Sequence, residues 1–377
     1  MKIALVCTKF SPAYGGLEKY TLFLARALRD AGHAVHLFAN RWEAETGLHF
    51  HHVPRIPFVS PLKNLSFAYW ANRRLAPIAF DVIHSMERIF YQDIFRASDG
   101  INPVQMRQKY PRPLVRKFKA AGPRRQVLSY LERRIFAARG CRYVMTNSEL
   151  VKGHIVAHYA VDPAKIVVIY NGVDTQTFNP GVRSRFRAQV RAAWGVSDRE
   201  RIVLFVANDF KRKGLQSLLE ALRLTADPHL RLIVVGRDDP KPYRRWARRH
   251  GLGRRVLFVG PHKAAEQCYG AADIFALPTI EDAFANVCLE AMACALPVIT
   301  TPSNGAAELI EEGLNGFVVE CGRAPELARR LQLTASAQQC RHMGQNAAQT
   351  ARRYTLDNHL REVMRLYRRV ASGGSGP

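Results

Sequence analysis

Three consecutive basic residues, Lys211, Arg212 and Lys213, stand in the stretch NDFKRKG (208–214). The stretch follows an apolar strand pattern and precedes a helical one, and ligands bind at the carboxyl ends of strands in α/β sheets. A guanidinium grips a phosphate through two hydrogen bonds, an ammonium adds a point charge, and a helix N-terminus attracts anions. The pattern predicts a diphosphate cradle, although a solvated turn would carry the same charges.

A second stretch, EDAFANVCLEAMACALP (281–297), combines acidic residues with a helical pattern suited to burial. We predict that Asn286 caps a helix starting at Val287. The backbone N–H groups of Val287 and Cys288 would then be free to face an anion.

The carboxylates of the same stretch fit the two ends of one elongated ligand. Glu290, one turn into the predicted helix, could accept hydrogen bonds from the vicinal hydroxyls of a ribose. Asp282 lies eight residues earlier, a span of about 12 Å if it were helical. A role for Glu290 in a salt bridge or with the helix dipole is the structural alternative.

Two further groups lie in loops of the N-terminal half. Gly15-Gly16 follows the first apolar strand pattern, where small residues let backbone amides approach a ligand, but a plain turn fits equally well. Asp99 precedes Gly100 just beyond an apolar stretch. An isolated Asp in such a place is usually a turn or cap residue.

Two successive runs of apolar strands and amphipathic helices must position these residues. Continuous apolar strands predict parallel sheets covered on both faces, so the fold class is α/β with two doubly wound units. We predict domains at 1–170 and 171–354, a helix at 355–370 that crosses back to the first domain, and a flexible tail at 371–377; Asn171-Gly172 is the turn signal at the junction. The predicted strands are 3–7, 34–39, 81–85, 143–147 and 166–170, then 201–207, 231–236, 256–260, 273–278, 297–301 and 316–320.

The formal net charge of +25 indicates an anionic partner, whether nucleic acid, a membrane surface or a phosphorylated substrate, unless it reflects a generally basic proteome. The charge concentrates in the basic segment, 104–142, which holds twelve Lys or Arg against one acid, Glu132. Interleaved apolar residues predict basic amphipathic helices that bind an anionic membrane surface. They are Leu114, Val115, Phe118, Val127, Leu128, Leu131, Ile135 and Phe136.

Several classes of protein are disfavoured because the sequence lacks their characteristic motifs. There is no P-loop and no G-x-G-x-x-G fingerprint, which argues against an NTPase and a dinucleotide oxidoreductase. No D-x-D stands where it could hold a divalent ion, and we expect neither metal nor cofactor. The seven cysteines are scattered and odd in number, no apolar stretch reaches about 20 residues, and the N-terminal apolar run is too short for a signal peptide. We therefore expect a cytoplasmic protein.

Taken together, Gly15-Gly16, NDFKRKG, NGVD (171–174) and the D-x7-E pattern leading into AMACALPVITT resemble the family-4 retaining glycosyltransferases. The resemblance covers nearly the whole chain and implies the GT-B fold, two Rossmann-like domains facing each other across a cleft. FSPAYGGLEKY, DFKRKG and VGRDDPKPY are similar to lipopolysaccharide core glucosyltransferases that act on an inner-core heptose.

The resemblance implies roles for residues at matching positions. Arg212 and Lys213 match the basic pair that holds the diphosphate and stabilises it as it leaves, and Glu290 matches the glutamate that holds the ribose. The first acid of the motif, here Asp282, lies near the donor hexose.

In the N-terminal half, the Gly15-Gly16 loop approaches the donor sugar and diphosphate in that family. Asp99 aligns with an aspartate of the core glucosyltransferases, where many relatives have His. The resemblance thus favours Asp99 as a catalytic residue that orients the sugar or the acceptor hydroxyl.

Three positions depart from the family pattern. Asp282 is one carbon shorter than the usual Glu, which bears on the choice of hexose. Asn208 stands where many relatives carry a second phosphate-binding Arg, and Ala295 stands where Gly is usual.

The function implied is retaining, metal-independent transfer of a glucose-like hexose from a nucleoside diphosphate sugar, with UDP as the expected nucleotide. The expected acceptor is a lipopolysaccharide core or another lipid-linked glycan at the inner face of the cell membrane, where the protein would be peripheral. An epimerase or a phosphorylase on the same fold is one alternative. A basic nucleic-acid-binding protein is another, although no recognition motif for nucleic acid is present.

Overall fold

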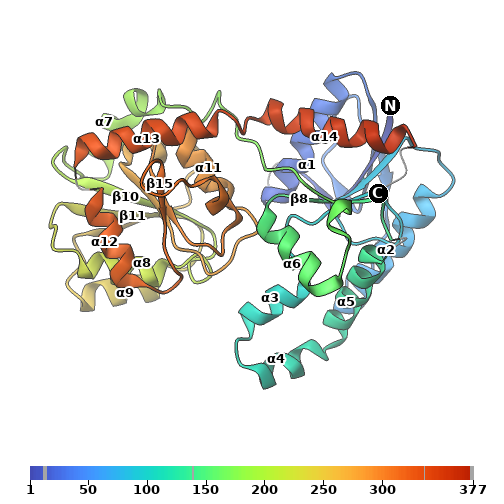
Figure 1. Ribbon diagram of the computed structural model, residues 1–377, viewed down its shortest axis with the longest axis horizontal. Coiled ribbons are helices and arrows are strands. Elements are labelled where there is room, and N and C mark those ends of the chain that lie inside the picture. The colour runs from blue at the N-terminus through green and yellow to red at the C-terminus, as the bar shows by residue number, and fades with distance from the viewer. Residues whose placement is uncertain (12–14, 138–139, 335, 374–377) are drawn as a thin grey trace. The chain divides into compact units, whose positions relative to one another are not determined.

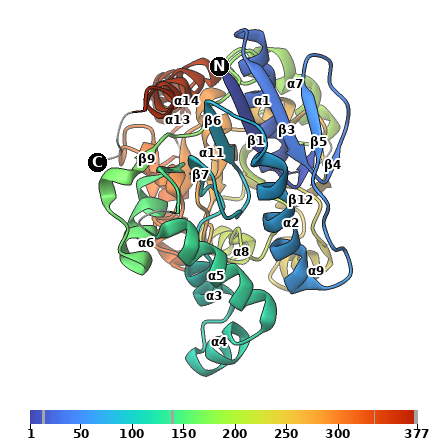
Figure 2. The same cartoon turned by 90° about the vertical axis from the view of Figure 1, so that its right-hand side faces the viewer.

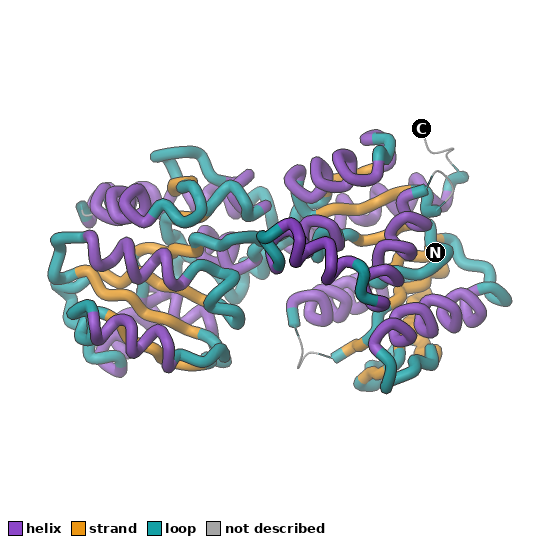
Figure 3. The backbone as a smooth tube through the Cα atoms, turned by 90° about the horizontal axis from the view of Figure 1, so that it is seen from below, coloured by secondary structure: helices purple, strands orange, loops and turns teal. Residues whose placement is uncertain are grey.

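The computed structural model describes residues 1–11, 15–137, 140–334 and 336–373. Contacts divide the chain into two units, one formed by Met1–Tyr170 with the chain from His359 onward, the other by Asn171–Asn358. In each unit parallel strands lie between helices, as Figures 1 and 3 show. The predicted α/β class with two doubly wound units is confirmed.

The sheet of the first unit has the strand order β5-β3-β1-β6-β7-β8-β9, and its neighbouring strands are parallel. The chain order reverses between β1 and β6, so the loops after these two strands emerge side by side at the switch point of the sheet. The elements are β1 Lys2–Val6, β2 Lys9–Phe10, α1 Gly16–Asp30, β3 Ala34–Ala39, β4 Arg41–Trp42, β5 His49–His52, α2 Ser60–Leu75, β6 Val82–Ser85, β7 Ile94–Arg96, α3 Asn102–Lys109, α4 Pro113–Ala120, α5 Pro123–Phe136, β8 Tyr143–Thr146, α6 Glu149–Tyr159, η1 Pro163–Lys165, β9 Ile166–Val168 and α14 Leu356–Ala371.

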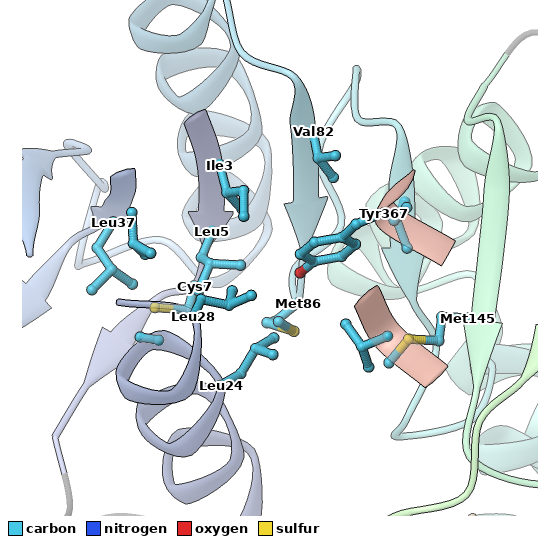
Figure 4. Packing of buried hydrophobic residues seen from close by; sticks show 14 of the residues in the cluster. Ile3, Leu5, Cys7, Leu24, Leu28, Leu37, Val82, Met86, Met145 and Tyr367 are labelled. Carbon is cyan, nitrogen blue, oxygen red and sulfur yellow. The ribbon is translucent and has the colours of Figure 1, made fainter. Parts of the chain in front are cut away.

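The C-terminal helix α14 is part of the core of the first unit. Val363 and Tyr367 lie in one buried cluster with Leu5 of β1, Leu24 of α1 and Met145 of β8 (Figure 4). The Tyr367 hydroxyl lies 2.6 Å from Nδ1 of the buried His84 on β6. The last helix of the chain therefore covers the first strands of the sequence.

The sheet of the second unit has the order β12-β11-β10-β13-β14-β15, again parallel, with its switch point between β10 and β13. This is the Rossmann order of strands. The elements are α7 Val182–Ala193, β10 Arg201–Val206, α8 Leu215–Leu224, β11 Leu230–Val235, α9 Lys241–Arg249, β12 Val256–Gly260, α10 Ala265–Ala271, β13 Ile274–Leu277, α11 Asn286–Ala293, β14 Val298–Thr300, η2 Gly305–Leu309, β15 Gly316–Val318, α12 Ala324–Leu333 and α13 Ala337–Ala351.

Each strand predicted from the apolar pattern is present, within one or two residues at its ends. The pattern missed β5 and β7 of this sheet, and also the two-residue strands β2 and β4. The sequence of β5, HFHH, is polar because this strand lies at the edge of its sheet. β7 is only three residues long, IFR, and is too short to give a periodic signal.

Gly214 lets the loops after β10 and β13 touch at the switch point of the second unit. Its φ is +81°, and a Cβ at this position would lie 1.9 Å from the carbonyl oxygen of Pro278. The Arg212 carbonyl accepts a hydrogen bond of 2.8 Å from the N–H of Ile280. Only glycine allows this close approach, because any side chain would overlap the backbone of the facing loop.

Gly214→Ala should therefore destabilise the second unit. The left-handed φ costs about 1–2 kcal/mol and the steric overlap about 1–3 kcal/mol more. Urea denaturation followed by tryptophan fluorescence measures the loss.

Gly251→Ala is the matched control, since Gly251 has a φ of +73° but no atom within 4 Å of the added Cβ. The control should lose only the conformational part, about 1–2 kcal/mol. Equal losses in the two variants would contradict the role given to the contact with Pro278.

Candidate functional site

Loops that follow β10 and β11 meet at the carboxyl edge of the second sheet. The N–H of Arg237 donates to Asn208 Oδ1 at 3.3 Å, and the N–H of Phe210 donates to Asp238 Oδ2 at 2.8 Å. Asn208, which stands where many relatives carry an Arg, thus supports the neighbouring loop. The basic residues 211–213 follow in the loop after β10, which these hydrogen bonds fix to the loop after β11.

The Lys213 ammonium forms an ion pair with the Asp282 carboxylate from the loop after β13. Their side chains are only 13% and 15% exposed. Asp282 Oδ1 also accepts a hydrogen bond of 3.3 Å from the N–H of Phe284. Burial, together with repulsion from Arg212, lowers the pKa of Lys213 to about 8. The sequence predicted that both residues face the ligand, but gave no sign that they pair.

Arg212 lies at the exposed rim of the same loop. Its Nε pairs with Asp209 at 3.2 Å, and its Nη1 donates to the backbone carbonyl of Glu281 at 3.1 Å. The guanidinium is therefore oriented by both loops while its side chain stays 46% exposed. A guanidinium held in this way is ready to bind an anion arriving from solvent.

Glu281 introduces a second group that titrates near neutral pH. Burial raises the pKa of its carboxyl to about 7, although the positive charges of Arg212 and Lys213 oppose that shift. The D-x7-E spacing to Glu290 selects Asp282 rather than Glu281 as the first acid of the motif. Asp282 is the one that pairs with Lys213, whereas Glu281 can be neutral in the physiological range.

Helix α11 begins at Asn286, one residue earlier than predicted, and its N-cap is Ala285 without a side-chain cap. The predicted cap is therefore wrong: Asn286 Oδ1 accepts a hydrogen bond of 2.7 Å from the amide of Asn171 instead. The prediction of a free N–H on Cys288 is also wrong, because that group donates to the Ala285 carbonyl at 2.9 Å. Val287 lies in the same first turn and is half-buried.

Asn304, which the sequence analysis did not single out, holds the loop before α11. Its Oδ1 accepts from the N–H groups of Ala285, at 3.0 Å, and Ala306, at 3.1 Å, while its amide donates to Thr300 at 2.9 Å. The side chain is buried. An Asn nineteen residues after Ala285 carries no local signal, since its role depends on β14 lying beside β13.

Glu290 is half-buried in α11, and one of its oxygens is fixed by a tyrosine. The hydroxyl of Tyr269, on α10, donates to Glu290 Oε2 at 2.8 Å. Tyr269 is fully buried, and burial together with the nearby carboxylate raises the pKa of its hydroxyl far above the usual value. The hydroxyl therefore stays protonated and orients the carboxylate, a positioning role that the sequence did not reveal.

Cys288 links the two halves of this arrangement. Its thiol is buried, and both Lys213 and Glu290 lie close enough to act on its pKa, which burial raises to about 12. The structure thus gathers Arg212, Lys213 and Asp282 with the first two turns of α11. Within the described ranges no three His, Cys, Asp or Glu side chains form a group that could hold a metal ion.

The other predicted residues belong to the first unit. Gly15 is the N-cap of α1 and Gly16 its first residue, and both are exposed. Among the residues that the structure describes, no atom lies within 4 Å of a Cβ built on Gly16. Asp99 is exposed in the turn after β7, and its charge acts on Glu87, Arg88 and Arg96.

The basic segment forms helices α3, α4 and α5, as predicted, but its apolar residues divide into two groups. Leu131, Ile135 and Phe136 of α5 are buried. On α4 no residue is buried, and the side chains of Leu114 and Phe118 are 84% and 77% exposed. Figure 2 shows α4 at the end of the segment that extends from the first sheet.

The single acid of the basic segment does not reach its surface. Glu132 is fully buried and accepts hydrogen bonds from Arg88 at 2.9 Å, the N–H of Asn102 at 3.0 Å and the Tyr159 hydroxyl at 2.5 Å. Its carboxylate is therefore paired and hydrogen-bonded inside the fold and does not contribute to the surface charge. The exposed side chains of this segment, in the part that the structure describes, therefore include cations but no carboxylate.

The sequence matches two family models. Residues 14–177 match "Glycosyltransferase Family 4" and residues 186–350 match "Glycosyl transferases group 1". Among solved structures, WaaG, a glycosyltransferase involved in lipopolysaccharide biosynthesis, superposes with a TM-score of 0.82 at 21% identity, covering 97% of this chain and 99% of that one. The Anabaena protein HepE, solved with UDP-glucose, superposes with a TM-score of 0.75 at 21% identity, covering 97% and 99%.

Curated relatives include two D-inositol 3-phosphate glycosyltransferases. The one from Segniliparus rotundus is 30% identical over 243 residues, 62% of this chain and about half (53%) of that protein. The one from Jonesia denitrificans is 24% identical over 416 residues, 99% of this chain and 97% of that protein.

Two Rossmann-type units, one with cations and a helix carboxylate at its switch point, define the GT-B class of glycosyltransferases. The chain belongs to glycosyltransferase family 4, and the resemblance seen in the sequence is confirmed. None of the described helices has both the length and the apolar character needed to cross a bilayer.

The pKa of Lys213 provides a test of the pair in the ligand-free protein. We expect the pKa of the Lys213 ammonium to be about 8, well below that of an exposed lysine, because the group is desolvated. NMR of the protein labelled at lysine Nζ measures this directly. Asp282→Asn should lower the pKa of Lys213 relative to the unaltered protein, since the ammonium loses the carboxylate with which it pairs.

Lys211→Gln is the control, because this side chain is exposed in the same loop and its removal should leave the titration of Lys213 unchanged. A Lys213 pKa near the ordinary value, or one insensitive to Asp282→Asn, would contradict the pairing.

Proposed function

We propose that the protein is a retaining hexosyltransferase that moves a glucose-like sugar from a nucleoside diphosphate sugar to a lipid-linked glycan of the lipopolysaccharide-core type at the inner face of the cell membrane. The observation that carries the proposal is the pair of cations, Arg212 and Lys213, beside the first turns of α11. The solved complexes of HepE with UDP and UDP-glucose support UDP as the nucleotide.

In the proposed mechanism the cations stabilise the charge that develops as the diphosphate leaves. Arg212 can bind bidentately from the rim, and Lys213 adds a buried charge that gains strength from its low-dielectric surroundings. Glu290, oriented by Tyr269, accepts from the ribose hydroxyls. The bond from the anomeric carbon to the diphosphate breaks, the bond to the acceptor oxygen forms on the same face, and the departing phosphate takes the acceptor proton. We propose no metal for this step.

We propose two roles for Asp282, one before and one after the donor binds. Without donor it neutralises Lys213, and an arriving diphosphate offers the ammonium a stronger partner. The released carboxylate can then accept from a hydroxyl of the hexose, as the family pattern implies. An aspartate reaches less far than the usual glutamate, so the hexose must come closer to the loop after β13.

In the first unit, we propose that the exposed Gly15-Gly16 loop approaches the donor and that Asp99 orients the acceptor hydroxyl. The absence of internal contacts around Gly16 supports a ligand as the reason for glycine there.

The basic segment supports a membrane-bound acceptor. Each basic residue near an anionic surface contributes about 1 kcal/mol, and burial of an exposed Leu or Phe about 1.5–3 kcal/mol. Helix α4 offers both, with Leu114 and Phe118 beside Arg112, Lys117 and Lys119. Nucleic acid is the less favoured anion, because solvent-exposed Leu and Phe suit a lipid interface.

A second acceptor class is a phosphorylated cyclitol, which the names of the curated relatives favour. A sugar-nucleotide epimerase remains the rival on the same fold. An epimerase would change the sugar without attaching it to any acceptor, so analysis of the products separates these alternatives.

Removal of the buried cation should damage catalysis. With UDP-glucose, GDP- and ADP-sugars as donors and truncated lipopolysaccharide as acceptor, nucleotide release should require one donor class. Lys213→Ala should lower kcat/KM by about 10²–10³-fold, the effect of losing one group that stabilises the transition state. Glu290→Gln should raise the KM for the donor.

The matched variant is Lys211→Ala, which removes an exposed lysine two positions away and should change kcat/KM by no more than about twofold. Equal effects at 211 and 213, or no turnover with any donor, would count against the proposal.

Membrane binding should depend on α4. In flotation with vesicles of phosphatidylglycerol and phosphatidylethanolamine, the double variant Leu114→Ser with Phe118→Ser should bind at least about tenfold more weakly, because two apolar side chains no longer insert. Binding of the unaltered protein should weaken at high salt.

The control replaces Leu224 and Leu314, which are 46% and 45% exposed in the second unit, with Ser. This variant should float like the unaltered protein. Salt-independent binding, or binding equally reduced in both double variants, would argue against a docking role for α4.

A further inference from the structure

A small polar pocket opens at the switch point of the first unit. It is lined by Thr8, just after β1, by Glu87 and Arg88, just after β6, and by Arg55 and Asn64 near the start of α2, with apolar walls from α2 and α5. The switch point of a doubly wound sheet is where such folds bind ligands. None of these residues belongs to the site described in the second unit.

Arg55 has no counter-ion among the residues that the structure describes. Its Nε is buried, and among the described residues no hydrogen bond or ion pair to its side chain is present. A buried donor of a charged group is costly to leave unsatisfied. Asn64 adds an amide on the same wall. The two side chains therefore offer donors to an anion that enters the pocket.

The other charges of the pocket do not cancel that of Arg55. Arg88 is already neutralised by Glu132, at 2.7 Å. Glu87 is half-buried and accepts from the N–H of Thr8 at 3.2 Å and from its hydroxyl. Burial and the nearby Asp99 raise the pKa of Glu87, so its carboxyl is more readily neutral and less repulsive to an anion.

We propose that this pocket binds an anionic group of the phosphomonoester class carried by the acceptor, with Arg55 as its cation and Asn64 as a further donor. The inference rests on the proposed transfer to a glycan or polyol acceptor and adds that the acceptor is phosphorylated. Asp99 is exposed in the turn after β7, and its charge acts on Glu87 and Arg88 of the pocket.

The experiment compares acceptors with and without phosphate. Truncated lipopolysaccharide is assayed before and after removal of its phosphates with hydrogen fluoride, and inositol 1-phosphate is assayed beside inositol. Arg55→Gln should raise the KM for the phosphorylated acceptor about 10–100-fold, leave the KM for the donor unchanged, and leave the dephosphorylated acceptor unaffected. Arg55→Lys should restore part of the affinity.

Arg74→Gln is the matched control, because it removes an exposed arginine from α2, the helix that follows Arg55 in the chain, and should leave every KM unchanged. A phosphate preference in the lipopolysaccharide arm identifies a glycan phosphate, and one in the inositol arm a free phosphorylated polyol. No preference in either arm, or a preference that survives Arg55→Gln, overturns the proposal.

Failure of the proposed function is recognised separately. If no acceptor is glycosylated, ³¹P NMR titration with inositol 1-phosphate and with inorganic phosphate still tests the pocket. Binding that is lost in Arg55→Gln and kept in Arg74→Gln supports the anion site, and equal binding in the three proteins refutes it.

Discussion

The contact between the loops that follow β10 and β13 is the constraint on which the candidate donor site depends. These strands are parallel neighbours at the point where the strand order reverses, so their carboxyl ends emerge together. Gly214 removes the side chain that would hold the loops apart, and the backbone of Arg212 bonds to that of Ile280. Lys213 can reach Asp282 only because of this contact. The pairing of a cation with an acid 69 residues away in the sequence is thus a consequence of backbone packing.

The partly buried charges of Lys213 and Asp282 show how the folded protein is preorganised to bind an anion. A desolvated ammonium is costly, which is why the pKa of Lys213 falls and why a carboxylate accompanies it. The ammonium of Lys213 is desolvated when the protein folds. The site therefore needs little reorganisation when a ligand replaces the Asp282 carboxylate. Tyr269 has a similar effect on Glu290, since a hydroxyl that cannot ionise fixes the direction of an acid that must stay available.

Burial of acids also shapes the first unit. Glu132 gathers Arg88, Asn102 and Tyr159, and so ties α5 to the loop after β6, to the start of α3 and to α6. The same acid is thereby withdrawn from the surface of the basic segment. One buried carboxylate both fixes these helices to the sheet and leaves their exposed faces cationic. The two units share a strand order, yet their switch points offer different groups.

From the sequence alone, continuous apolar strands separated by amphipathic helices determined two parallel α/β units, because burial on both faces of a sheet leaves that pattern in the chain. Gly, Lys, Arg, Asp and Glu at fixed spacings also determined the family. Tertiary structure decided what those residues contact. The Lys213–Asp282 ion pair, the hydrogen bond from Tyr269 to Glu290 and the hydrogen bonds of Asn304 to the loop before α11 all join residues from different parts of the fold. Such contacts follow from the order of strands in a sheet, and strand order leaves no local periodicity in a sequence. The mistaken cap at Asn286 has the same origin, because Asn171 and Asn304 provide the competing hydrogen bonds from outside the motif.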